Sequence, residues 1–304
     1  MDTAVIEVSN LSQRYGERVA VRDVSFSVRR GEIFGIVGPN GAGKTTTVEC
    51  IEGLRPGYGG SIRVLGLDPR RDRAALRQRV GVQLQASELP GRIKVWEALE
   101  LYGSFYRRPA DWKRLLGELG LEGSRNSVFE KLSGGQKQRL SVALALVGNP
   151  EVAFLDELTT GLDPQARRDT WRLIERARDG GVTVVLVSHF MEEAERLCDR
   201  IAVIDAGRVV ALDTPAGLAA RAGGDQTLRF RPSAPLDERL LAGLPEVSGI
   251  SQQGGLVRVS GSGNLLGAVA AVLARHQIIA ADLRLERATL DDAFVALTTR
   301  KESK

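Results

Sequence analysis

The residues with the clearest chemistry lie in one glycine-rich segment, 38–45, which reads Gly-Pro-Asn-Gly-Ala-Gly-Lys-Thr. An apolar run, Ile33–Val37, precedes it, and a helical pattern runs from Lys44 to about Leu54. A strand, a glycine-rich loop and a Lys-Thr pair opening a helix can surround phosphate oxygens with backbone N–H groups and the positive end of the helix. We expect Lys44 to reach the β- and γ-phosphates and Thr45 to bind Mg²⁺. The segment therefore predicts a nucleoside triphosphate site.

Two adjacent carboxylates, Asp156 and Glu157, follow the apolar run Val152–Leu155. A carboxylate at the end of a buried strand can hold Mg²⁺, directly or through water, so we assign Asp156 to the metal. Glu157 would then point at the γ-phosphate and polarise the attacking water. The alternative, a solvated start of a loop, is disfavoured because a buried run precedes the pair and the chain also carries a phosphate loop.

His189 is one of only two histidines, and it comes just after another apolar run, Val182–Val187. A single histidine is usually structural. Its position favours a functional role, because ligands of open parallel sheets bind beyond the carboxyl ends of the strands. Gly38, Asp156 and His189 all stand at such ends. The other histidine, His276, lies within a helical pattern, and we interpret it as structural.

A second anion-binding helix start lies in the segment Leu132–Arg139. The Ser133 hydroxyl can cap a helix there, and the amides of Gly134 and Gly135 can bind an anion. One triphosphate does not need two such cradles in a single site, so we expect this one to close over nucleotide held by another subunit. Taken alone, the segment would be explained by an ordinary Ser-Gly-Gly helix cap.

Together these motifs resemble the nucleotide-binding subunit of ABC transporters, and the likeness spans roughly residues 4–220. In the family's order they are the adenine-stacking Tyr15 in Arg14-Tyr15-Gly16, the Walker A loop at 38–45, the Q-loop glutamine Gln85, the signature at 132–136, the Walker B pair Asp156-Glu157, the D-loop Gly161-Leu162-Asp163 and the switch histidine His189. Gln83 is a second glutamine near the Q-loop, and position favours Gln85. Leu158 stands where the family often has proline, which alters the stiffness of the turn rather than a reacting group.

The resemblance implies an α/β fold, a P-loop NTPase core of the ABC type with an antiparallel β subdomain and a helical signature subdomain at about residues 86–150. It implies ATP and Mg²⁺ as cofactors. The implied catalytic residues are Glu157, His189 and Lys44, and the implied metal ligands are Thr45, Gln85 and Asp156. The residues expected to bind nucleotide are Tyr15, Gly38, Pro39, Asn40, Gly41, Ala42, Gly43, Lys44, Thr45, Thr46, Gln85, Ser133, Gly134, Gly135, Gln136 and Asp163.

The resemblance also implies a pair of subunits, most simply a homodimer, packed head to tail with two ATP molecules between them. Ser133, Gly135 and Asp163 of one subunit would then face nucleotide held by the other. ATP closes such a dimer, and hydrolysis reopens it. Gln85 would link the Mg²⁺ site to the helical region, where a membrane subunit docks.

The pattern of apolar and polar residues changes at residues 222–225, Ala-Gly-Gly-Asp. This change predicts a linker between an ATP-binding domain at 1–222 and a small α+β domain at 225–304. In the second domain, Thr227–Phe230 and Val257–Ser260 alternate as half-buried strands. Thr289 and Asp292 predict a capping box at the start of a final helix. One helix face is marked by Leu265, Leu266, Val269, Val272 and Leu273.

The composition is that of an ordinary globular protein, with 43% hydrophobic residues and a formal net charge of +4. The arginines between Asp68 and Arg79 could contact acidic lipid or nucleic acid, but a solvated helix face is the favoured interpretation. Cys50 and Cys198, far apart and without metal-ligand neighbours, suit a reducing compartment. We find no signal peptide and no apolar run of about 18–20 residues, so we expect a cytoplasmic protein that reaches the membrane through a partner.

The expected function is ATP-driven export of a hydrophobic small molecule, a drug, an antibiotic or a lipid, through a separate integral-membrane permease. Leu285–Phe294 is similar to the ending of bacterial ABC exporter ATPases of the daunorubicin/doxorubicin-resistance type. A cytosolic ABC ATPase acting on ribosomes or nucleic acid is the alternative; such proteins usually carry two cassettes or a long coiled-coil insertion, so we expect no nucleic-acid partner. Import is disfavoured because the tail is short for an importer's β-rich regulatory domain.

Overall fold

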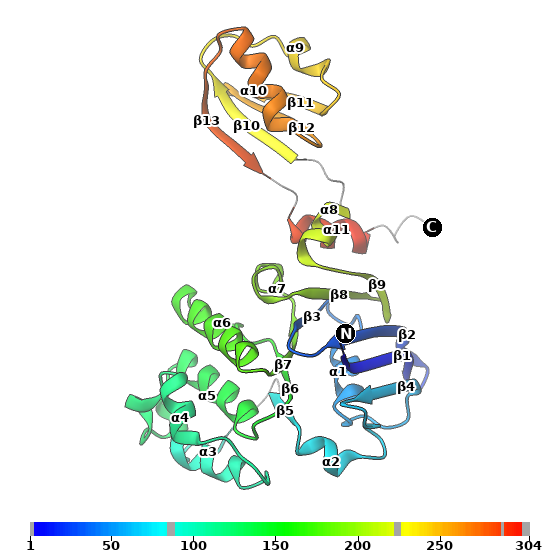
Figure 1. Ribbon diagram of the computed structural model, residues 1–304, viewed down its shortest axis with the longest axis vertical. Helices are drawn as coiled ribbons and strands as arrows, with labels where there is room; N and C mark the ends of the chain where they lie inside the picture. Colours follow the sequence, from blue (N-terminus) through cyan, green and yellow to red (C-terminus); the bar gives the residue numbers. More distant parts are fainter. Residues whose placement is uncertain (1–2, 84–88, 222–225, 287–288, 300–304) are drawn as a thin grey trace. The chain divides into compact units, whose positions relative to one another are not determined.

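A computed structural model describes residues 3–83, 89–221, 226–286 and 289–299 (Figure 1). The chain divides into two compact units, residues 1–215 and 216–304, and each is described by itself. The predicted linker at 222–225 lies outside the described residues. Of the helices in the described ranges, none is long and apolar enough to cross a membrane.

The described part of the first unit is built on one nine-stranded sheet. In spatial order its strands are β4 (Gly59–Val64), β1 (Ala4–Tyr15), β2 (Arg18–Arg29), β9 (Arg208–Asp213), β8 (Arg200–Asp205), β3 (Ile33–Val37), β7 (Thr183–Ser188), β6 (Val152–Asp156) and β5 (Val80–Gln83). The central strands β8, β3, β7, β6 and β5 pair in parallel. β1 pairs antiparallel with β2 and β4. The predicted α/β class with an antiparallel β part is therefore confirmed.

The central strands are apolar at nearly every position, because helices cover both faces of this sheet. Every residue of β3 and β7 is buried. The strand predicted at residues 33–37 is confirmed in full, and the apolar runs before Asp156 and His189 form β6 and β7. Each of these strands ends where a candidate site residue begins. The sheet is thus the element that brings the candidate residues to one edge.

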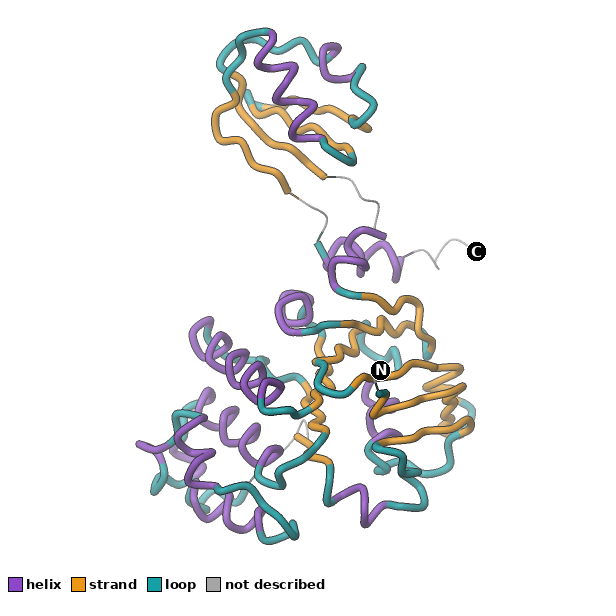
Figure 2. The backbone as a smooth tube through the Cα atoms, in the orientation of Figure 1, coloured by secondary structure: helices purple, strands orange, loops and turns teal. Residues whose placement is uncertain are grey.

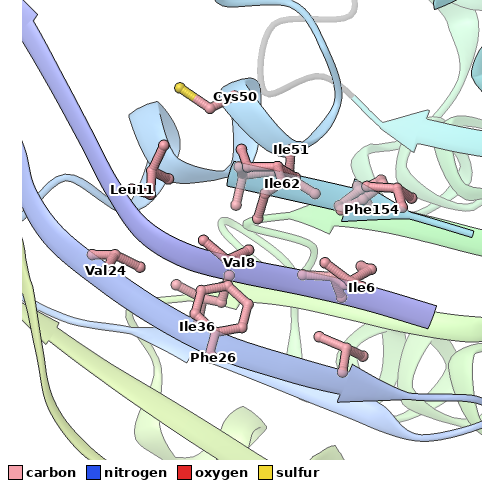
Figure 3. Close-up of a cluster of buried hydrophobic side chains, with 14 of the residues drawn as sticks. Ile6, Val8, Leu11, Val24, Phe26, Ile36, Cys50, Ile51, Ile62 and Phe154 are labelled. Atoms are coloured by element: carbon pink, nitrogen blue, oxygen red, sulfur yellow. The ribbon is translucent and has the colours of Figure 1, made fainter. Parts of the chain in front are cut away.

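The antiparallel strands and α1 (Lys44–Ile51) enclose a cluster of buried apolar side chains, which Figure 3 shows in close-up. Ile6 and Val8 of β1 lie in it with Phe26 of β2 and Ile51 of α1. Each fully buried side chain of this size contributes about 1.5–3 kcal/mol. This packing fixes α1, and with it the phosphate loop that precedes the helix. The helix ends at Ile51 rather than about Leu54, because Gly53 adopts a positive φ of 75°.

The helical region expected around residues 86–150 contains α3 (Val95–Gly103), α4 (Trp112–Glu118), two short 3₁₀ turns (Glu122–Ser124 and Phe129–Lys131) and α5 (Gly134–Leu146). α5 packs against α3, β5 and β6, so the region is attached at the β5 edge of the sheet (Figure 2). After it come α6 (Pro164–Asp179) and α7 (Met191–Leu197). Within α3, Leu99 is fully buried, whereas Trp96 and Tyr102 are half-buried.

The arginine-rich stretch forms the short helix α2 (Arg73–Arg77) and its flanks. Arg73 donates to the carbonyl of Gly53 at 2.9 Å, and Arg79 pairs with Glu151 at 2.6 Å. Several of these guanidinium groups therefore hold the first unit together rather than forming a free basic surface.

The second unit contains a four-stranded antiparallel sheet in the order β11 (Val247–Gln253), β12 (Leu256–Gly261), β10 (Gln226–Pro232) and β13 (Ala280–Glu286). Its helices are α8 (Pro215–Arg221, at the boundary), α9 (Arg239–Ala242), α10 (Leu265–Arg275) and α11 (Leu290–Thr299). The predicted strands at 227–230 and 257–260 are confirmed within β10 and β12. Their inward residues, among them Phe230 and Val257, form an apolar core with Val269 of α10.

Two details of this unit bear on the helices. The Thr289–Asp292 capping box is confirmed, since the Thr289 N–H donates to Asp292 Oδ2 at 2.8 Å and the Asp292 N–H donates to Thr289 Oγ1 at 3.3 Å. The helix face predicted in α10 is wrong at Leu266, which is 38% exposed. It follows Leu265, which is fully buried, and consecutive helical residues point in different directions.

Candidate active site

A cleft of about 490 Å³ lies in the first unit at the carboxyl ends of the central strands. It is lined by Tyr15, Arg18, Ala20, Asn40, Gly41, Gly43, Lys44, Thr45, Thr46, Asp156, Glu157 and Val187. The cleft therefore brings together the glycine-rich loop and the carboxylate pair, which are more than 100 residues apart in the sequence. Open parallel sheets place their ligands at this edge.

The glycine-rich loop can form only because its glycines have no side chain. Gly43 adopts a φ of 100°, and a Cβ there would collide with the carbonyl of Ala20 on β2. A Cβ on Gly38 would strike the carbonyl of Ile204 on β8. The loop thus lies close against the backbone of β2 and β8, an approach that a side chain at either glycine would prevent.

Lys44 is the last residue but one of this loop, and it is only 9% exposed. Its Nζ donates to the carbonyls of Gly38, at 2.7 Å, and Pro39, at 3.0 Å. Burial lowers the pKa of Lys44, while the charges of Glu157 and Asp156 raise it. A cation held by carbonyl oxygens at the floor of a cleft suits the binding of a polyanion.

Asp156 ends β6 beside the loop. Burial, and then the charge of Glu157, raise its pKa to about 6, whereas Lys44 and His189 act in the opposite direction. An anionic carboxylate here is therefore unfavourable without a further cation. The electrostatics of the site therefore favour the binding of a cation beside Asp156.

Glu157 and His189 form a contact across the ends of β6 and β7. His189 Nδ1 lies 3.3 Å from Glu157 Oε1. The backbone of Glu157 has a φ of 48°, rare for a residue with a side chain, and its N–H donates to the carbonyl of Val187 at 3.0 Å. Non-glycine residues held in this region cost about 1–3 kcal/mol and occur often at functional sites. The turn after Asp156 thus aims the Glu157 carboxylate at the cleft and at His189.

The second predicted cradle lies outside this cleft. Ser133 caps α5 in a capping box: the Gln136 N–H donates to Ser133 Oγ at 3.3 Å, and the Ser133 N–H donates to Gln136 Oε1 at 2.9 Å. Asp163 caps α6, accepting from the N–H groups of Gln165 and Ala166, each at 2.9 Å. Backbone hydrogen bonding, chiefly from Ala166, lowers the pKa of Asp163. Ser133, Gly134, Gly135, Gln136 and Asp163 are all absent from the cleft lining.

Comparison with known proteins decides the family. Residues 21–160 match the ABC transporter family. The daunorubicin resistance ATP-binding protein DrrA3 of Streptomyces coeruleorubidus is 37% identical over 98% of this chain and 96% of its own. The linearmycin resistance ATP-binding protein LnrL of Bacillus subtilis (strain 168) is 32% identical over 97% of this chain and 99% of its own. This chain is an ABC transporter ATP-binding protein. The predicted family and ATPase activity are thereby confirmed, and the family binds ATP.

Further matches agree with this assignment. The Nod factor export ATP-binding protein I of Ralstonia nicotianae (strain ATCC BAA-1114 / GMI1000) is 41% identical over 80% of this chain and 78% of its own. A solved ATP-binding subunit of an ABC transporter superposes with a TM-score of 0.66 at 30% identity, covering 72% of this chain and 93% of its own. A bacterial ABC transporter cassette, MJ0796, solved as a dimer, gives 0.61 at 29% identity over 69% of this chain and 98% of its own.

The remaining nucleotide candidates of this ABC ATPase fall in different places. Gly38, Pro39 and Ala42 belong to the loop but do not line the cleft. His189 does not line it either, but it contacts Glu157, which does. Gln85, the expected Q-loop residue, lies outside the described residues. Tyr15 lines the cleft and is 40% exposed, with the Arg55 guanidinium 5.8 Å from its ring centre.

The structure brings further polar residues to the site: Glu49 and Glu52, which the sequence did not single out, and Gln83, which it placed second to Gln85. A smaller cavity of about 210 Å³ is shared by Thr45 and Asp156 with Glu49, Glu52 and Gln83. Burial, then the charges of Asp156 and Glu49, raise the pKa of Glu52 to about 8. The Gln83 side chain is 7% exposed, and its Oε1 has no hydrogen-bond partner within the described part of the chain.

A sequence signal for these residues exists but is weak. Gln83 is a polar residue at the end of the apolar strand β5, and Glu52 follows Cys50 and Ile51 directly after α1. Either could have been read as solvent-exposed. Their shared cavity with Asp156 follows only from the way β5, β6 and α1 meet.

Proposed function

We propose that this ABC ATPase energises the export of a hydrophobic small molecule, a drug, an antibiotic or a lipid, through a separate integral-membrane permease. The observation that carries the proposal is the extent of two matches. The daunorubicin and linearmycin resistance proteins align over 98% and 97% of this chain, and so include its C-terminal unit. The solved cassettes cover 72% and 69%. Because the similarity extends beyond the ATP-binding domain, it favours a function like that of these two proteins.

Within the cleft we assign Glu157 as the general base that takes a proton from the attacking water. A base of this kind contributes roughly 10²–10⁴-fold to the rate. His189, 3.3 Å from the Glu157 carboxylate, would keep that carboxylate and the γ-phosphate in one orientation. Lys44 would exchange its loop carbonyls for β- and γ-phosphate oxygens, and Tyr15 would stack on adenine.

The same cleft offers the hard oxygen donors that Mg²⁺ prefers, the Thr45 hydroxyl and the Asp156 carboxylate. The raised pKa of Asp156 supports this assignment, because a cation there would offset the crowding of negative charge. No group of three His, Cys, Asp or Glu among the described residues could hold a metal by itself. That fits an ion shared between protein and phosphate oxygens, with Gln85 as a further ligand. When bound, Mg²⁺ would neutralise charge on the phosphates.

ABC ATPases dimerise and work with permease subunits, and for this chain we propose a head-to-tail homodimer. The signature residues Ser133, Gly134, Gly135 and Gln136 lie at an exposed helix start outside the cleft. Asp163 is likewise exposed at the start of α6. A second subunit would give these groups a ligand: each ATP would bind the loop of one chain and the signature of the other.

We further propose that the protein acts on the cytoplasmic face of the cell membrane, attached through its permease. The competing class is an ABC ATPase that acts on ribosomes or nucleic acid. It is less well supported, because guanidinium groups of the arginine-rich stretch 68–79, among them those of Arg73 and Arg79, make contacts within the first unit.

Purification of the Glu157→Gln protein from membranes with ATP tests the proposal, because a variant that binds but does not hydrolyse ATP should stay in its closed complex. We expect a polytopic membrane protein to co-purify with it. The matched control is Glu195→Gln, the same change at an exposed position of α7. Recovery of ribosomes or nucleic acid in place of a membrane protein would overturn the export proposal.

A further inference from the structure

A fully buried carboxylate lies four residues after His189. Glu193, on α7, is 0% exposed, and none of the roles assigned above uses it. Burial raises its pKa, while hydrogen bonding to Ser188 and to neighbouring side chains lowers it. A buried carboxylate costs several kcal/mol unless its oxygens are well bonded. A side chain this costly at this position calls for a reason beyond packing.

One oxygen of Glu193 holds the peptide that carries His189. Ser188 Oγ donates to Glu193 Oε2 at 2.6 Å. The same Ser188 Oγ accepts from the N–H of Phe190 at 3.0 Å. Both neighbours of His189 are therefore tied to one hydroxyl, and Glu193 fixes that hydroxyl. The direction of the His189 side chain depends on this arrangement.

The other oxygen contacts α6, the helix that follows the Glu157 turn. The indole Nε1 of Trp171, on α6, donates to Glu193 Oε1 at 3.4 Å. Thr159, two residues after Glu157 and 0% exposed, also lowers the pKa of Glu193, although its Oγ1 makes no hydrogen bond within the described residues. α6 begins at Pro164, shortly after Glu157, so the bond from Trp171 links Glu193 to the helix that follows the Glu157 turn.

We propose that Glu193 is a positioning residue for ATP hydrolysis. Its carboxylate joins the Ser188–Phe190 turn to Trp171 of α6, the helix that follows the Glu157 turn, and so maintains the 3.3 Å approach of His189 to Glu157. The inference rests on the roles proposed above for Glu157 and His189. Misplacement of a reacting group by about 1 Å can cost about 10²-fold in rate, so a buried anchor at this point has a large effect on turnover.

The first test compares steady-state ATP hydrolysis by Glu193→Ala, Glu193→Gln and the exposed control Glu195→Gln. We expect Glu193→Ala to lower kcat by about 10–100-fold while KM for ATP changes less than about 3-fold. Glu193→Gln has the same shape and can still accept from Trp171, so it should recover kcat to within about 5-fold of wild type. Equal losses for the Ala and Gln variants, or a loss confined to KM, would overturn the proposal.

Two milder variants keep the proposal testable if Glu193→Ala does not fold. Ser188→Ala removes the link to the His189 peptide, and Trp171→Phe removes the indole N–H that donates to Glu193 from α6. Each should lower kcat by about 3–10-fold at unchanged affinity for a fluorescent ATP analogue. Wild-type kcat in both folded variants would contradict the role of Glu193.

A double-mutant cycle decides whether Glu193 acts through His189. In a His189→Ala background, measured by single turnover, Glu193→Gln should lower the rate no further, because the group being positioned is already gone. Independent, multiplying losses would overturn positioning through His189. Wild-type turnover in His189→Ala alone would refute the role proposed for His189 and the present inference with it. A slow His189→Ala beside an unaffected Glu193→Ala would refute only the inference.

Discussion

The two units of this chain differ in the side chains that they bury. Among the described residues, every buried polar or charged side chain belongs to the first unit, with Lys44, Gln83 and Glu193 as examples. The core of the second unit consists of apolar side chains such as Phe230 and Val259. Both units are sheets covered by helices, so the contrast does not come from secondary structure content.

The contrast follows from how the strands are connected. Parallel strands need crossover connections, so β3, β6 and β7 all present their carboxyl ends at the same edge. Polar groups that follow these strands are forced together and partly desolvated. Antiparallel strands such as β11 and β12 alternate in direction, so their ends divide between both edges. The buried polar groups of the first unit therefore lower its stability but form a site. The core of the second unit, which is apolar, contributes to packing alone.

Glu157→Gln should have the largest effect and tests whether the chemistry resides at that edge. We expect ATP turnover to fall by roughly 10²–10⁴-fold through loss of a general base. Because Gln has nearly the same shape, ATP affinity should stay within about 3-fold of wild type. Phosphate release and equilibrium binding measure the two effects, with Glu195→Gln as the control. Hydrolysis within a few-fold of wild type would show that another group activates the water.

Phe230→Ala in β10 tests whether the core of the second unit is separate from the chemistry. Removing this fully buried ring should destabilise that unit by about 3–5 kcal/mol, through lost burial and a cavity. Hydrogen exchange in β10 and β12 measures this loss. The three tryptophans, Trp96, Trp112 and Trp171, all lie in the first unit, so their fluorescence should report unchanged unfolding there.

The control for Phe230→Ala is Leu266→Ala, a smaller loss at a residue that is 38% exposed. It should cost less than about 1.5 kcal/mol, since little of that side chain leaves water on folding. ATP turnover should remain within about 2-fold of wild type in both variants. A large drop in turnover for folded Phe230→Ala would break the division between a chemical and a packing unit.

Apart from the Leu266→Ala control, Glu52→Gln should have the smallest effect, and it tests how much the buried carboxyl at the site lowers the stability of the folded chain. The pKa of Glu52 is raised from 4.5 to about 8, so between these values the folded chain holds a proton that the unfolded chain has lost. Wild-type stability should therefore fall as pH rises from about 4.5 through about 8. The Gln variant does not titrate, so between pH 5 and pH 9 it should gain about 2–4 kcal/mol relative to wild type.

Denaturant unfolding of nucleotide-free protein at several pH values measures the difference for Glu52→Gln. Glu195→Gln, on an exposed side chain, should follow the wild-type profile. If the wild-type and Glu52→Gln profiles ran parallel across this range, Glu52 would be ionised in the folded chain and the cavity would be more polar than its lining indicates.

Much of the first unit could be predicted because its signals are local. The apolar runs before Gly38, Asp156 and His189 gave strands with bounds close to those observed. The glycines around Lys44 carry information because few other residues can adopt their backbone angles or approach neighbouring strands so closely. In the second unit, alternation in β10 and the capping box at Thr289 are likewise local patterns.

The misses share one cause, which is that burial is a property of the assembled chain. Leu266 matched an apolar helix face but lies towards solvent. Glu52 reads as an ordinary polar residue, and Gln83 ranked behind Gln85, yet both line a cavity with Asp156. Glu193 lies within the acidic run Met191–Leu197, where the sequence shows no difference between it and its exposed neighbour Glu192.

The sequence by itself determined the chemistry of this protein: a phosphate loop, a carboxylate pair, a histidine and a second glycine-rich helix start, each recognisable from a few adjacent residues. Only the tertiary structure decided which of them share a cleft, that the signature and Asp163 lie outside it, and that Glu193 joins the His189 turn to α6. The physical reason is the range of the interactions. Backbone conformation and helix capping act over a few residues, whereas desolvation and hydrogen bonds between distant segments exist only once the sheet has brought its strands together.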